Sequence, residues 1–480
     1  MNKKPSQSPT RPRAPLSARP PRAPANNPPA KPAPISPARA AAFEILLRVG
    51  SSDAHSDDLL HSPRVNALSS DDRNLTTALV MGVLRWQIAL DARIAKLLSR
   101  PDQRLAEPVA IALRLGAFQL LHMDRIPPHA ALNESVELCR AAAHPHAAGM
   151  VNAILREIAR QSPTNQTAPQ TAARRTPLFE SPAAFAQRLG HPAWLVERWV
   201  ANHGRDAALA ICDYDQHEAQ REPDAAKLFP APPDSLPHID DGSRLVAELA
   251  AAALAAAVSI ASLTTAPRIW DCCAAPGGKT LVLADRLPHA HILATDISAK
   301  RLARTAQRIV STPHAARIRC EVIDATQPSF PSGPQSNTAL FDLILCDAPC
   351  SGTGTLARNP EIRHRLQPED LPRQAARQIA ILRGALTQLA PGGRLLYSTC
   401  SLEPEENAHV IETVLRESPD TIKLLPIGPL LTSLAHAGIL PADTATALTQ
   451  TAIRDPYLRT LPGIHPCDGF FAALLERATV

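Results

Sequence analysis

The feature of this sequence that most constrains its fold is a change of hydrophobic period near Arg268. Upstream, apolar residues recur three and four positions apart, as in 41–47, 75–84 and 111–120, which predicts amphipathic helices. Downstream, short apolar runs alternate with helical segments. The expected strands are 269–270, 291–294, 318–323, 341–346 and 394–398. Strands separated by helices predict an α/β fold with a mostly parallel sheet.

Changes of composition divide the chain further. The run QSPTNQTAPQTAARRTPL has no period and is rich in Pro, Gln and Thr, which is typical of a linker. Helical segments resume after it, and a Pro-broken stretch from Asp213 to Asp241 has no clear secondary structure. The expected segments are a disordered basic tail at 1–36, an all-α bundle at 37–160, a linker at 161–178, a helical linker at 179–241 and an α/β domain at 242–480.

The net charge is concentrated at the N-terminus. The first 36 residues carry seven Lys or Arg residues and no acid, whereas the whole chain has a formal charge of +5. The rest therefore carries about −2, and the basic, Pro-rich tail cannot bury a core. Two interpretations stay open for this tail: a solubilising extension, or an arm that binds phosphates and loses affinity as salt rises.

Two observations bear on the compartment. No apolar stretch follows the basic N-terminal residues, so no signal peptide is predicted. The apolar run 245–263 is short, Ala-rich and contains Glu248, which favours a buried helix over a membrane span. The nine cysteines are scattered, mostly within apolar runs, and do not resemble a disulfide framework. We expect free thiols in a cytoplasmic protein.

The first chemical motif is DCCAAPGGKT at 271–280, which follows one strand and opens a helix. In an open parallel sheet, this turn lies where nucleotide-like ligands bind. Neither common phosphate loop fits, because a Walker A loop needs Gly where Cys273 stands and the pattern GxGxxG is absent. The small residues predict that the backbone approaches a ligand closely.

Two aspartates, Asp296 and Asp324, follow the next two strands. A carboxylate at the tip of the second strand commonly accepts hydrogen bonds from ribose hydroxyls, and acids on successive strands suit an adenosine with its ribose and exocyclic amine. The alternative for each residue alone is a helix N-cap. Because the two aspartates follow successive strands, the pair favours a ligand-binding role over two helix N-caps.

Two cysteines follow the fourth and fifth strands. Cys350 lies in DAPCSGTG, shortly after Asp347, and Cys400 lies in STCS. Each cysteine alone is more often an inert buried residue. A zinc site is the other alternative, but adjacent cysteines do not form the usual CxxC pairs, so we expect no metal. The sulfurs available for such a site are those of Cys272, Cys273, Cys346 and Cys350.

With these motifs, the chain resembles the Sun/RsmB family of RNA (cytosine-C5) methyltransferases over about 37–475. The motifs that carry the resemblance are DCCAAPGGKT, the Asp296 strand end with Arg301-Leu302, DAPCSGTGT, RNPEIRHR from Arg358, YSTCSLEPEEN from Tyr397 and DGFFAA from Asp468. Their order and spacing match the family. The resemblance implies a Rossmann-like catalytic domain that uses S-adenosyl-L-methionine.

The resemblance also implies roles for residues. By this match, Cys400 is the nucleophile and Cys350 assists release of the methylated base. DNA cytosine-C5 methyltransferases instead attack with the cysteine of a Pro-Cys motif, and the second cysteine, in Ser-Thr-Cys, favours the RNA family. Spacing alone leaves the two roles open. The implied cofactor residues are Cys273, Ala274, Ala275, Pro276, Gly277, Gly278, Lys279, Asp296, Asp324 and Asp347.

Cytosine chemistry explains why two thiols and a carboxyl group would share one site. Carbon 5 of cytosine is too weak a nucleophile to take a methyl group from a sulfonium. A thiolate that adds to carbon 6 makes carbon 5 enamine-like, and after methyl transfer the loss of a proton and elimination restore the ring. Asp347 is placed to hydrogen-bond the N3 edge of the base, which must leave any stack to be reached.

The segment 37–160 is similar to the NusB-like RNA-binding bundle that precedes the catalytic domain in the rRNA enzymes of this family. That similarity implies 16S ribosomal RNA as the partner, naked or in a precursor particle; we expect a monomer and no membrane contact. One departure is that the family's α/β RNA-binding subdomain is curtailed, with only 213–241 to hold it. Two other functions stay open: a non-catalytic rRNA-binding or assembly factor, and a tRNA (cytosine-C5) methyltransferase.

Overall fold

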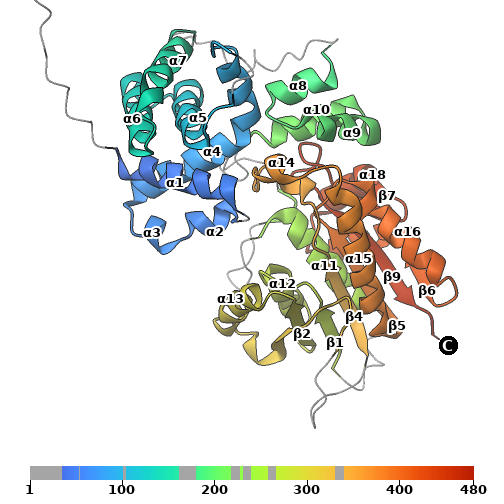
Figure 1. The fold of residues 1–480 in the computed structure, drawn as a ribbon. Helices are drawn as coiled ribbons and strands as arrows, with labels where there is room; N and C mark the ends of the chain where they lie inside the picture. Colours follow the sequence, from blue (N-terminus) through green and yellow to red (C-terminus); the bar gives the residue numbers. More distant parts are fainter. Residues whose placement is uncertain are drawn as a thin grey trace, which may run out of the picture.

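In the described residues, an α-helical bundle is followed by three helices and then by a domain built on one sheet (Figure 1). This arrangement confirms the predicted fold class. The tail up to residue 34, the linker from 162 and most of 213–241 lie outside the described residues. The structure is a computed structural model that describes residues 35–52, 54–100, 104–161, 180–217, 227–230, 239–257, 266–329 and 340–479.

The N-terminal bundle buries one apolar face of each long helix. Leu79, Leu113 and Leu155 come from three of these helices and are fully buried in one core. Apolar residues three and four positions apart lie on one helix face, which is why the predicted period produces this core. The helices are α1 (Pro37–Ser51), α2 (Ser56–Leu60), α3 (Pro63–Asn66), α4 (Ser70–Ala95), α5 (Glu107–His122), α6 (Pro128–Ala141), the short turn η1 (Pro145–Ala147) and α7 (Ala148–Gln161).

Three helices stand between the bundle and the sheet: α8 (Pro182–Arg188), α9 (Ala193–His203) and α10 (Arg205–Tyr214). Their core contains Phe185 and Trp199, both fully buried. Leu356 and Leu402 of the C-terminal domain belong to the same core. These helices are therefore packed onto the loops that follow two strands of the sheet.

One nine-stranded sheet is described in the C-terminal domain, in the order β3-β2-β1-β4-β5-β9-β8-β7, with β6 also paired to β9. Strands β1 to β5 pair in parallel, whereas β9 runs antiparallel to β5, β6 and β8. The strand order reverses between β1 and β4, which is the switch point where open α/β sheets bind ligands. The strands are β1 (Arg268–Asp271), β2 (His291–Asp296), β3 (Ile318–Val322), β4 (Phe341–Asp347), β5 (Leu389–Thr399), β6 (Ile422–Leu425), β7 (Ile453–Arg454), β8 (Tyr457–Arg459) and β9 (Phe471–Arg477).

Helices cover both faces of the sheet, so its central strands are continuous apolar runs. Leu343 and Leu345 of β4 share a core with α11, whereas Ile344 and Cys346 share the opposite core with α15 and α16. The described part of the apolar run 245–263 belongs to α11 and is mostly buried up to Leu254, as predicted. The helices and short turns are α11 (Asp241–Ala257), α12 (Gly278–Arg286), α13 (Ala299–Val310), η4 (Ala315–Arg317), η5 (Thr353–Thr355), α14 (Ile362–Arg365), α15 (Asp370–Thr387), η6 (Pro404–Glu406), α16 (Ala408–Glu417), α17 (Gly428–His436) and α18 (Ala442–Thr451).

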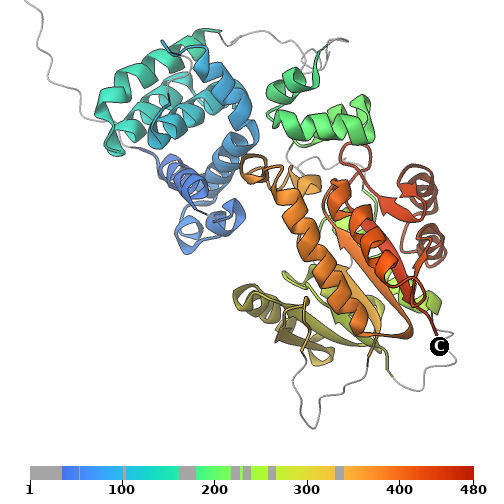
Figure 2. The ribbon, with the colours of Figure 1, turned by 45° about the vertical axis from the view of Figure 1, so that its right-hand side comes forward.

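Helix α14 joins the C-terminal domain to the bundle and to α8–α10, and lies between them in Figures 1 and 2. Arg363 of α14 is only 2% exposed. Burial lowers the pKa of Arg363 to about 10, so the guanidinium stays charged at neutral pH. It donates, at 2.9, 3.2 and 2.9 Å, to the carbonyl oxygens of Arg85, Gly190 and Asp215.

The neighbours of Arg363 strengthen this junction. Glu361 accepts hydrogen bonds from the backbone N–H and the hydroxyl of Ser56, at 3.1 and 3.0 Å. A guanidinium nitrogen of Arg365 donates to the carbonyl oxygens of Val49 and Ala54, at 2.9 and 2.7 Å. One short segment of the C-terminal domain therefore caps backbone groups in both the bundle and the α8–α10 part.

None of the helices in the described ranges combines the length and the apolar character needed to cross a membrane.

The junction makes a stability prediction. Arg363→Ala should lower the free energy of unfolding by about 2–4 kcal/mol, because it leaves buried carbonyl groups without their charged donor. Arg383→Ala, which removes an exposed pair with Glu417, is the control and should cost no more than about 1 kcal/mol. Urea titration measures both values. Equal losses in the two variants would show that α14 does not hold the parts together.

Candidate active site

A pocket of about 290 Å³ lies at the carboxyl ends of the parallel strands, at the switch point between β1 and β4. Residues that follow each of the five parallel strands line it. Of the site residues predicted from the sequence, those in its lining are Cys273, Ala275, Asp296, Asp324, Asp347, Cys350 and Cys400. Those outside its lining are Ala274, Pro276, Gly277, Gly278 and Lys279.

The two strand-end aspartates hold the turns that follow them. Oδ1 of Asp296 accepts from the backbone N–H of Ser298 at 2.8 Å, and Oδ1 of Asp324 accepts from the N–H and hydroxyl of Thr326 at 2.9 and 2.8 Å. The N-cap of α13 is Ser298, so the cap role considered for Asp296 belongs to that serine. Oδ2 of Asp296 lies 3.6 Å from Arg301, and no described residue donates to Oδ2 of Asp324. Each carboxylate keeps acceptor capacity for a ligand.

The glycines of the loop after β1 serve protein packing. Gly277 has φ +94°, a conformation that glycine adopts readily, and a Cβ there would lie 2.8 Å from a methyl group of Thr305. A Cβ at Gly278 would lie 2.6 Å from a methyl group of Ile239. The space that glycine leaves at both positions is therefore taken by protein side chains, and the approach of a ligand to the backbone of this loop stays a prediction.

Asp271 lies at the base of this loop and is 1% exposed. The hydroxyl of Thr280 donates to its Oδ2 at 2.6 Å. Burial raises the pKa of Asp271 to about 7, although the hydrogen bond from Thr280 opposes this. Its role is to tie the start of α12 to the end of β1.

Asp347 is held in a fixed orientation at the end of β4. Nζ of Lys279 lies 2.7 Å from its Oδ2, and the hydroxyl of Ser398 donates to its Oδ1 at 2.7 Å. Burial alone would lower the pKa of Lys279, but the carboxylate of Asp347 raises it above its ordinary value. The ammonium of Lys279 therefore stays charged at neutral pH. Lys279, which the sequence predicts to bind the cofactor, contacts Asp347 in this structure.

The sulfurs of Cys350 and Cys400 lie 3.4 Å apart. Strands β4 and β5 pair in parallel with Asp347 opposite Ser398, so the residues that follow emerge side by side. The contact with Cys400 raises the pKa of Cys350 well above its ordinary value, and burial adds to the effect. Cys350 is therefore held in its protonated form at neutral pH.

The cysteines that a zinc site would use divide between two separate contacts. Cys272 shares hydrogen bonds with Cys273 and Cys346, whereas Cys350 contacts Cys400. Across the described ranges, no group of three or more His, Cys, Asp or Glu side chains is arranged to hold a metal ion. All nine cysteines are free thiols, as expected.

The rest of the lining fits the adenosine part of S-adenosyl-L-methionine. Ile297 is a large apolar side chain that is 55% exposed, and Ile323, Ala325 and Ile381 add apolar surface. A planar base would cover this surface, and the carboxylates beside it are acceptors for ribose and amine groups. The residues present therefore suit the cofactor that the resemblance implies.

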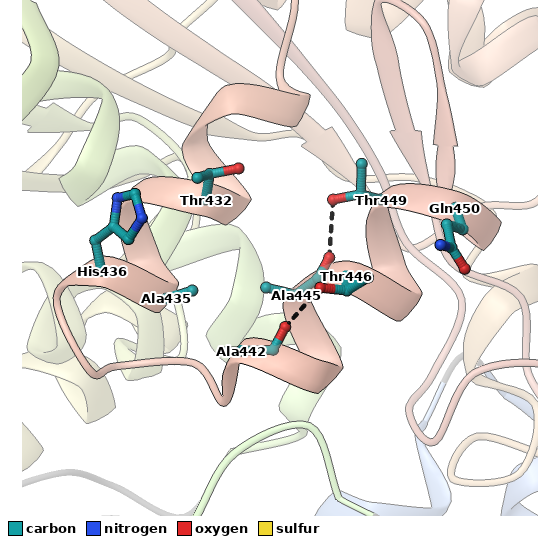
Figure 3. Close-up of a pocket in the computed structure, with 8 residues that line it drawn as sticks. All are labelled: Thr432, Ala435, His436, Ala442, Ala445, Thr446, Thr449 and Gln450. Atoms are coloured by element: carbon teal, nitrogen blue, oxygen red, sulfur yellow. Dashed lines mark hydrogen bonds between the residues drawn. The ribbon is translucent and has the colours of Figure 1, made fainter.

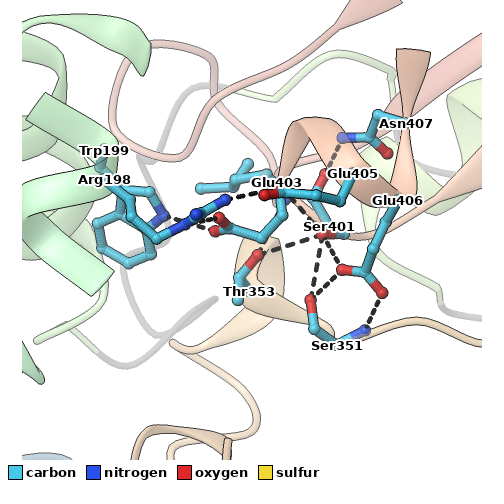
Figure 4. A network of polar contacts seen from close by, with 10 residues as sticks. Arg198, Trp199, Ser351, Thr353, Ser401, Glu403, Glu405, Glu406 and Asn407 are labelled. Carbon is cyan, nitrogen blue, oxygen red and sulfur yellow. Dashed lines mark hydrogen bonds and ion pairs between the residues drawn. The ribbon is translucent and has the colours of Figure 1, made fainter. Parts of the chain in front are cut away.

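Sequence reasoning missed Glu406, which Figure 4 shows in contact with Ser351 and Ser401. This glutamate is fully buried and accepts hydrogen bonds from Ser351 and Ser401, the residues that follow the two cysteines. Its motif, LEPEEN, contains three acids, a pattern more typical of a solvent-exposed turn. Arg377 of α15 also lines the pocket and was missed, because a single Arg on a helix carries no sequence signal.

A second hollow, of about 390 Å³, lies between α17 and α18 (Figure 3). It contains none of the predicted site residues, and we assign it no part in the site. Its lining is Thr432, Ala435, His436, Ala442, Ala445, Thr446, Thr449 and Gln450.

The strand order, the pocket at the switch point and the acids at the strand ends define an S-adenosyl-L-methionine-dependent methyltransferase. Residues 260–476 match the family model described as 16S rRNA methyltransferase RsmB/F, and residues 36–160 match the NusB family. Ribosomal RNA small subunit methyltransferase B of Salmonella enteritidis PT4 is 32% identical over 467 residues, which cover 91% of this chain and 97% of that protein. The chain therefore belongs to the RsmB/F family of 16S rRNA methyltransferases.

Other comparisons agree with this membership. The protein of the same name from Citrobacter koseri is 32% identical over 443 residues, which cover 86% of this chain and 92% of that protein. A solved structure titled "Crystal Structure of PH0851" aligns with a TM-score of 0.63 at 20% identity and covers 93% of this chain and 100% of that chain. At that identity the alignment supports the fold alone.

Asp271 makes the stability of the protein depend on pH. Its pKa is raised in the folded state, so between about 4 and about 7 the folded protein holds a proton that the unfolded chain has released, and stability falls as pH rises. Asp271→Asn removes this titration. From pH 5 to pH 8 the variant should gain roughly 2 kcal/mol of unfolding free energy relative to the wild type.

Urea titration at the two pH values measures this difference. Asp443→Asn, at an exposed position of α18, is the control and should leave the pH dependence of the wild type unchanged. If Asp271→Asn and the wild type have parallel pH dependences, Asp271 does not titrate in this range.

Proposed function

We propose that this protein transfers the methyl group of S-adenosyl-L-methionine to carbon 5 of a specific cytidine in 16S ribosomal RNA, through a covalent adduct of Cys400 with carbon 6. The observation that carries this proposal is the pair of thiols, 3.4 Å apart, beside Asp347 in one pocket. One thiol is enough for attack on the base. A second thiol in contact with it suits a reaction that must also release a covalent intermediate.

The carboxylates of Asp296 and Asp324 bind the ribose and the exocyclic amine of the cofactor in this proposal. When bound, the cofactor supplies an electrophilic methyl group beside the ends of β4 and β5. Asp347 takes part in both the cofactor site and the base site. The remaining proposed cofactor contacts come from the loop after β1, at Cys273, Ala274, Ala275, Pro276, Gly277, Gly278 and Lys279.

The base is bound above the two thiols. The thiolate of Cys400 adds to carbon 6, and the electron pair of the C5–C6 double bond becomes available at carbon 5, where the methyl group is accepted. Asp347 accepts a hydrogen bond from the exocyclic amine on the N3 edge, and the ammonium of Lys279 beside it stabilises the electron density that the ring gains. Carbon 5 then loses its proton to solvent, the C6–sulfur bond breaks to return the thiolate of Cys400, and Cys350 assists the release.

The NusB-like bundle is the part that we propose to hold the ribosomal RNA, as naked RNA or in a precursor particle. Helix α14 joins this bundle to the segment that carries Cys350, so RNA bound to the bundle lies at a fixed position relative to the pocket. We further propose that the enzyme works as a monomer in the cytoplasm, without a metal ion.

The role of Cys400 has a direct test. Cys400→Ala should abolish transfer of labelled methyl to unmodified 16S rRNA, because no other residue supplies the thiolate that activates the base. Cys320→Ser is the matched control, since Cys320 lies on β3 outside the pocket lining and should keep wild-type activity. Methyl incorporation and mapping of 5-methylcytosine give the readout.

Three results would contradict this proposal. Full activity of Cys400→Ala would overturn the mechanism. Label that enters tRNA alone would overturn the substrate. Cofactor binding without turnover on 16S rRNA or its precursor particle would indicate a non-catalytic assembly factor.

The proposed role of Cys350 predicts a different result from that of Cys400. Cys350→Ala should still attack the base but release it slowly, so a covalent protein–RNA adduct should accumulate and appear as a slower band in denaturing gels. The double variant Cys350→Ala/Cys400→Ala should form no adduct. An adduct of equal yield in the double variant would mean that another residue attacks.

A further inference from the structure

Each of the two thiols is followed in the chain by a serine, and both serines bind one buried carboxylate (Figure 4). The backbone N–H of Ser351 donates to Oε1 of Glu406 at 2.8 Å, and the hydroxyls of Ser351 and Ser401 both donate to Oε2. The two hydroxyl oxygens lie 3.1 Å apart. Glu406 therefore joins the loop after β4 to the loop after β5, one residue beyond Cys350 and Cys400.

Further hydrogen bonds fix Glu406 and the loop that carries Cys350. Nε2 of Gln378, on α15, donates to Oε1 of Glu406 at 3.0 Å and to the carbonyl oxygen of Pro349 at 2.9 Å. The hydroxyl of Tyr397 donates to the backbone carbonyl of Glu406 at 2.7 Å. The residues on both sides of Cys350 are held, which restricts its movement away from the partner thiol.

The loop that carries Cys400 is held by the residue after Glu406. Nδ2 of Asn407 donates to the carbonyl oxygen of Ser401 at 2.8 Å, and its Oδ1 accepts from the hydroxyl of Thr399 at 2.6 Å. The residues before and after Cys400 are thus tied to Asn407. Glu406 and Asn407 together therefore hold the loop that carries Cys350 and the loop that carries Cys400 by hydrogen bonds.

Glu406 lies in the core. Its side chain is 0% exposed, and among the described residues its carboxylate contacts a backbone N–H, two hydroxyls and an amide, but no cation. Burial of a carboxylate costs free energy, which these hydrogen bonds offset. A carboxylate can accept from all four donors, whereas the nitrogen of a glutamine in the same place accepts nothing.

We propose that Glu406 is a positioning residue of the methyl transfer: its carboxylate locks the loops of Cys350 and Cys400 together, so that both sulfurs face the same base. Glu406 is not part of the pocket lining and acts through Ser351 and Ser401. This inference rests on the proposed function, because the relative position of the thiols matters only if both serve one base.

The test is Glu406→Gln, which keeps the shape of the side chain but turns one acceptor into a donor. With unmodified 16S rRNA, kcat should fall by about 100-fold, as expected for small displacements of reacting groups, while KM for cofactor and RNA stays unchanged. Glu405→Gln is the matched control, because Glu405 pairs with Arg198 at 2.7 Å and does not contact the thiol loops. It should keep the wild-type kcat.

A second readout isolates the attack step. RNA with 5-fluorocytidine at the target traps the adduct, since carbon 5 then has no proton to lose. The rate of adduct formation should fall in Glu406→Gln by a factor similar to the fall in kcat, with unchanged RNA affinity. A wild-type rate of trapping, or a change confined to KM, would overturn the positioning role.

Two milder variants keep the inference testable if Glu406→Gln does not fold. Ser351→Ala and Ser401→Ala each remove one hydroxyl from the carboxylate and should each slow trapping, with folding checked by thermal unfolding. Wild-type trapping in both folded variants would overturn the proposal. A wild-type enzyme that neither methylates nor is trapped would refute the proposed function itself, whereas an active wild type matched by Glu406→Gln would refute only the positioning role.

Discussion

The parallel pairing of β4 with β5 is the constraint on which the rest of the site depends. Its register places Cys346 opposite Tyr397 and Asp347 opposite Ser398. Parallel neighbours leave the sheet at the same edge, so two cysteines that are 50 residues apart in the chain come within 3.4 Å. A shift of this register by one residue would reverse the faces of the strand and separate the thiols.

Buried polar contacts convert this register into a defined geometry. Asp347 is fixed by Lys279 and Ser398, and the two thiol loops are fixed by Glu406. Hydrogen bonds in a low-dielectric core are costly to break, so the loops keep one arrangement. The segment that starts at Cys350 continues into α14, whose guanidinium groups cap carbonyls of the bundle. The two thiols and the NusB-like bundle are therefore connected through one short stretch of chain.

The local pattern of the sequence predicts the class of the fold and the position of the strands. Alternation of short apolar runs with helices identified β1 to β5, and the thiols were expected at strand ends because their motifs follow apolar runs. That the thiols are in contact depends on which strands are neighbours, which local patterns do not specify. The roles of Cys400 and Cys350, the cofactor contacts and the domain boundaries remain predictions.

Other features depend on long-range pairing that no local pattern shows. The apolar run of β9 is compatible with either a helix or a strand. It forms a strand because it pairs with β5. The segment RNPEIRHR resembles a charged surface, yet Arg363 is buried because carbonyl groups from distant parts of the chain satisfy it. The burial of Glu406 could not be predicted from the sequence for the same reason, since the four groups that donate to its carboxylate come from three separate segments.

The proposed mechanism requires that one thiol, that of Cys400, bonds to the target base. To test this bond, the wild-type enzyme is trapped on a 16S rRNA fragment that contains 5-fluorocytidine, the complex is digested, and the bound nucleotide is located by mass spectrometry. We expect a nucleotide on the peptide that contains Cys400, attached through carbon 6. A nucleotide on Cys350, or on neither cysteine, would contradict this mechanism.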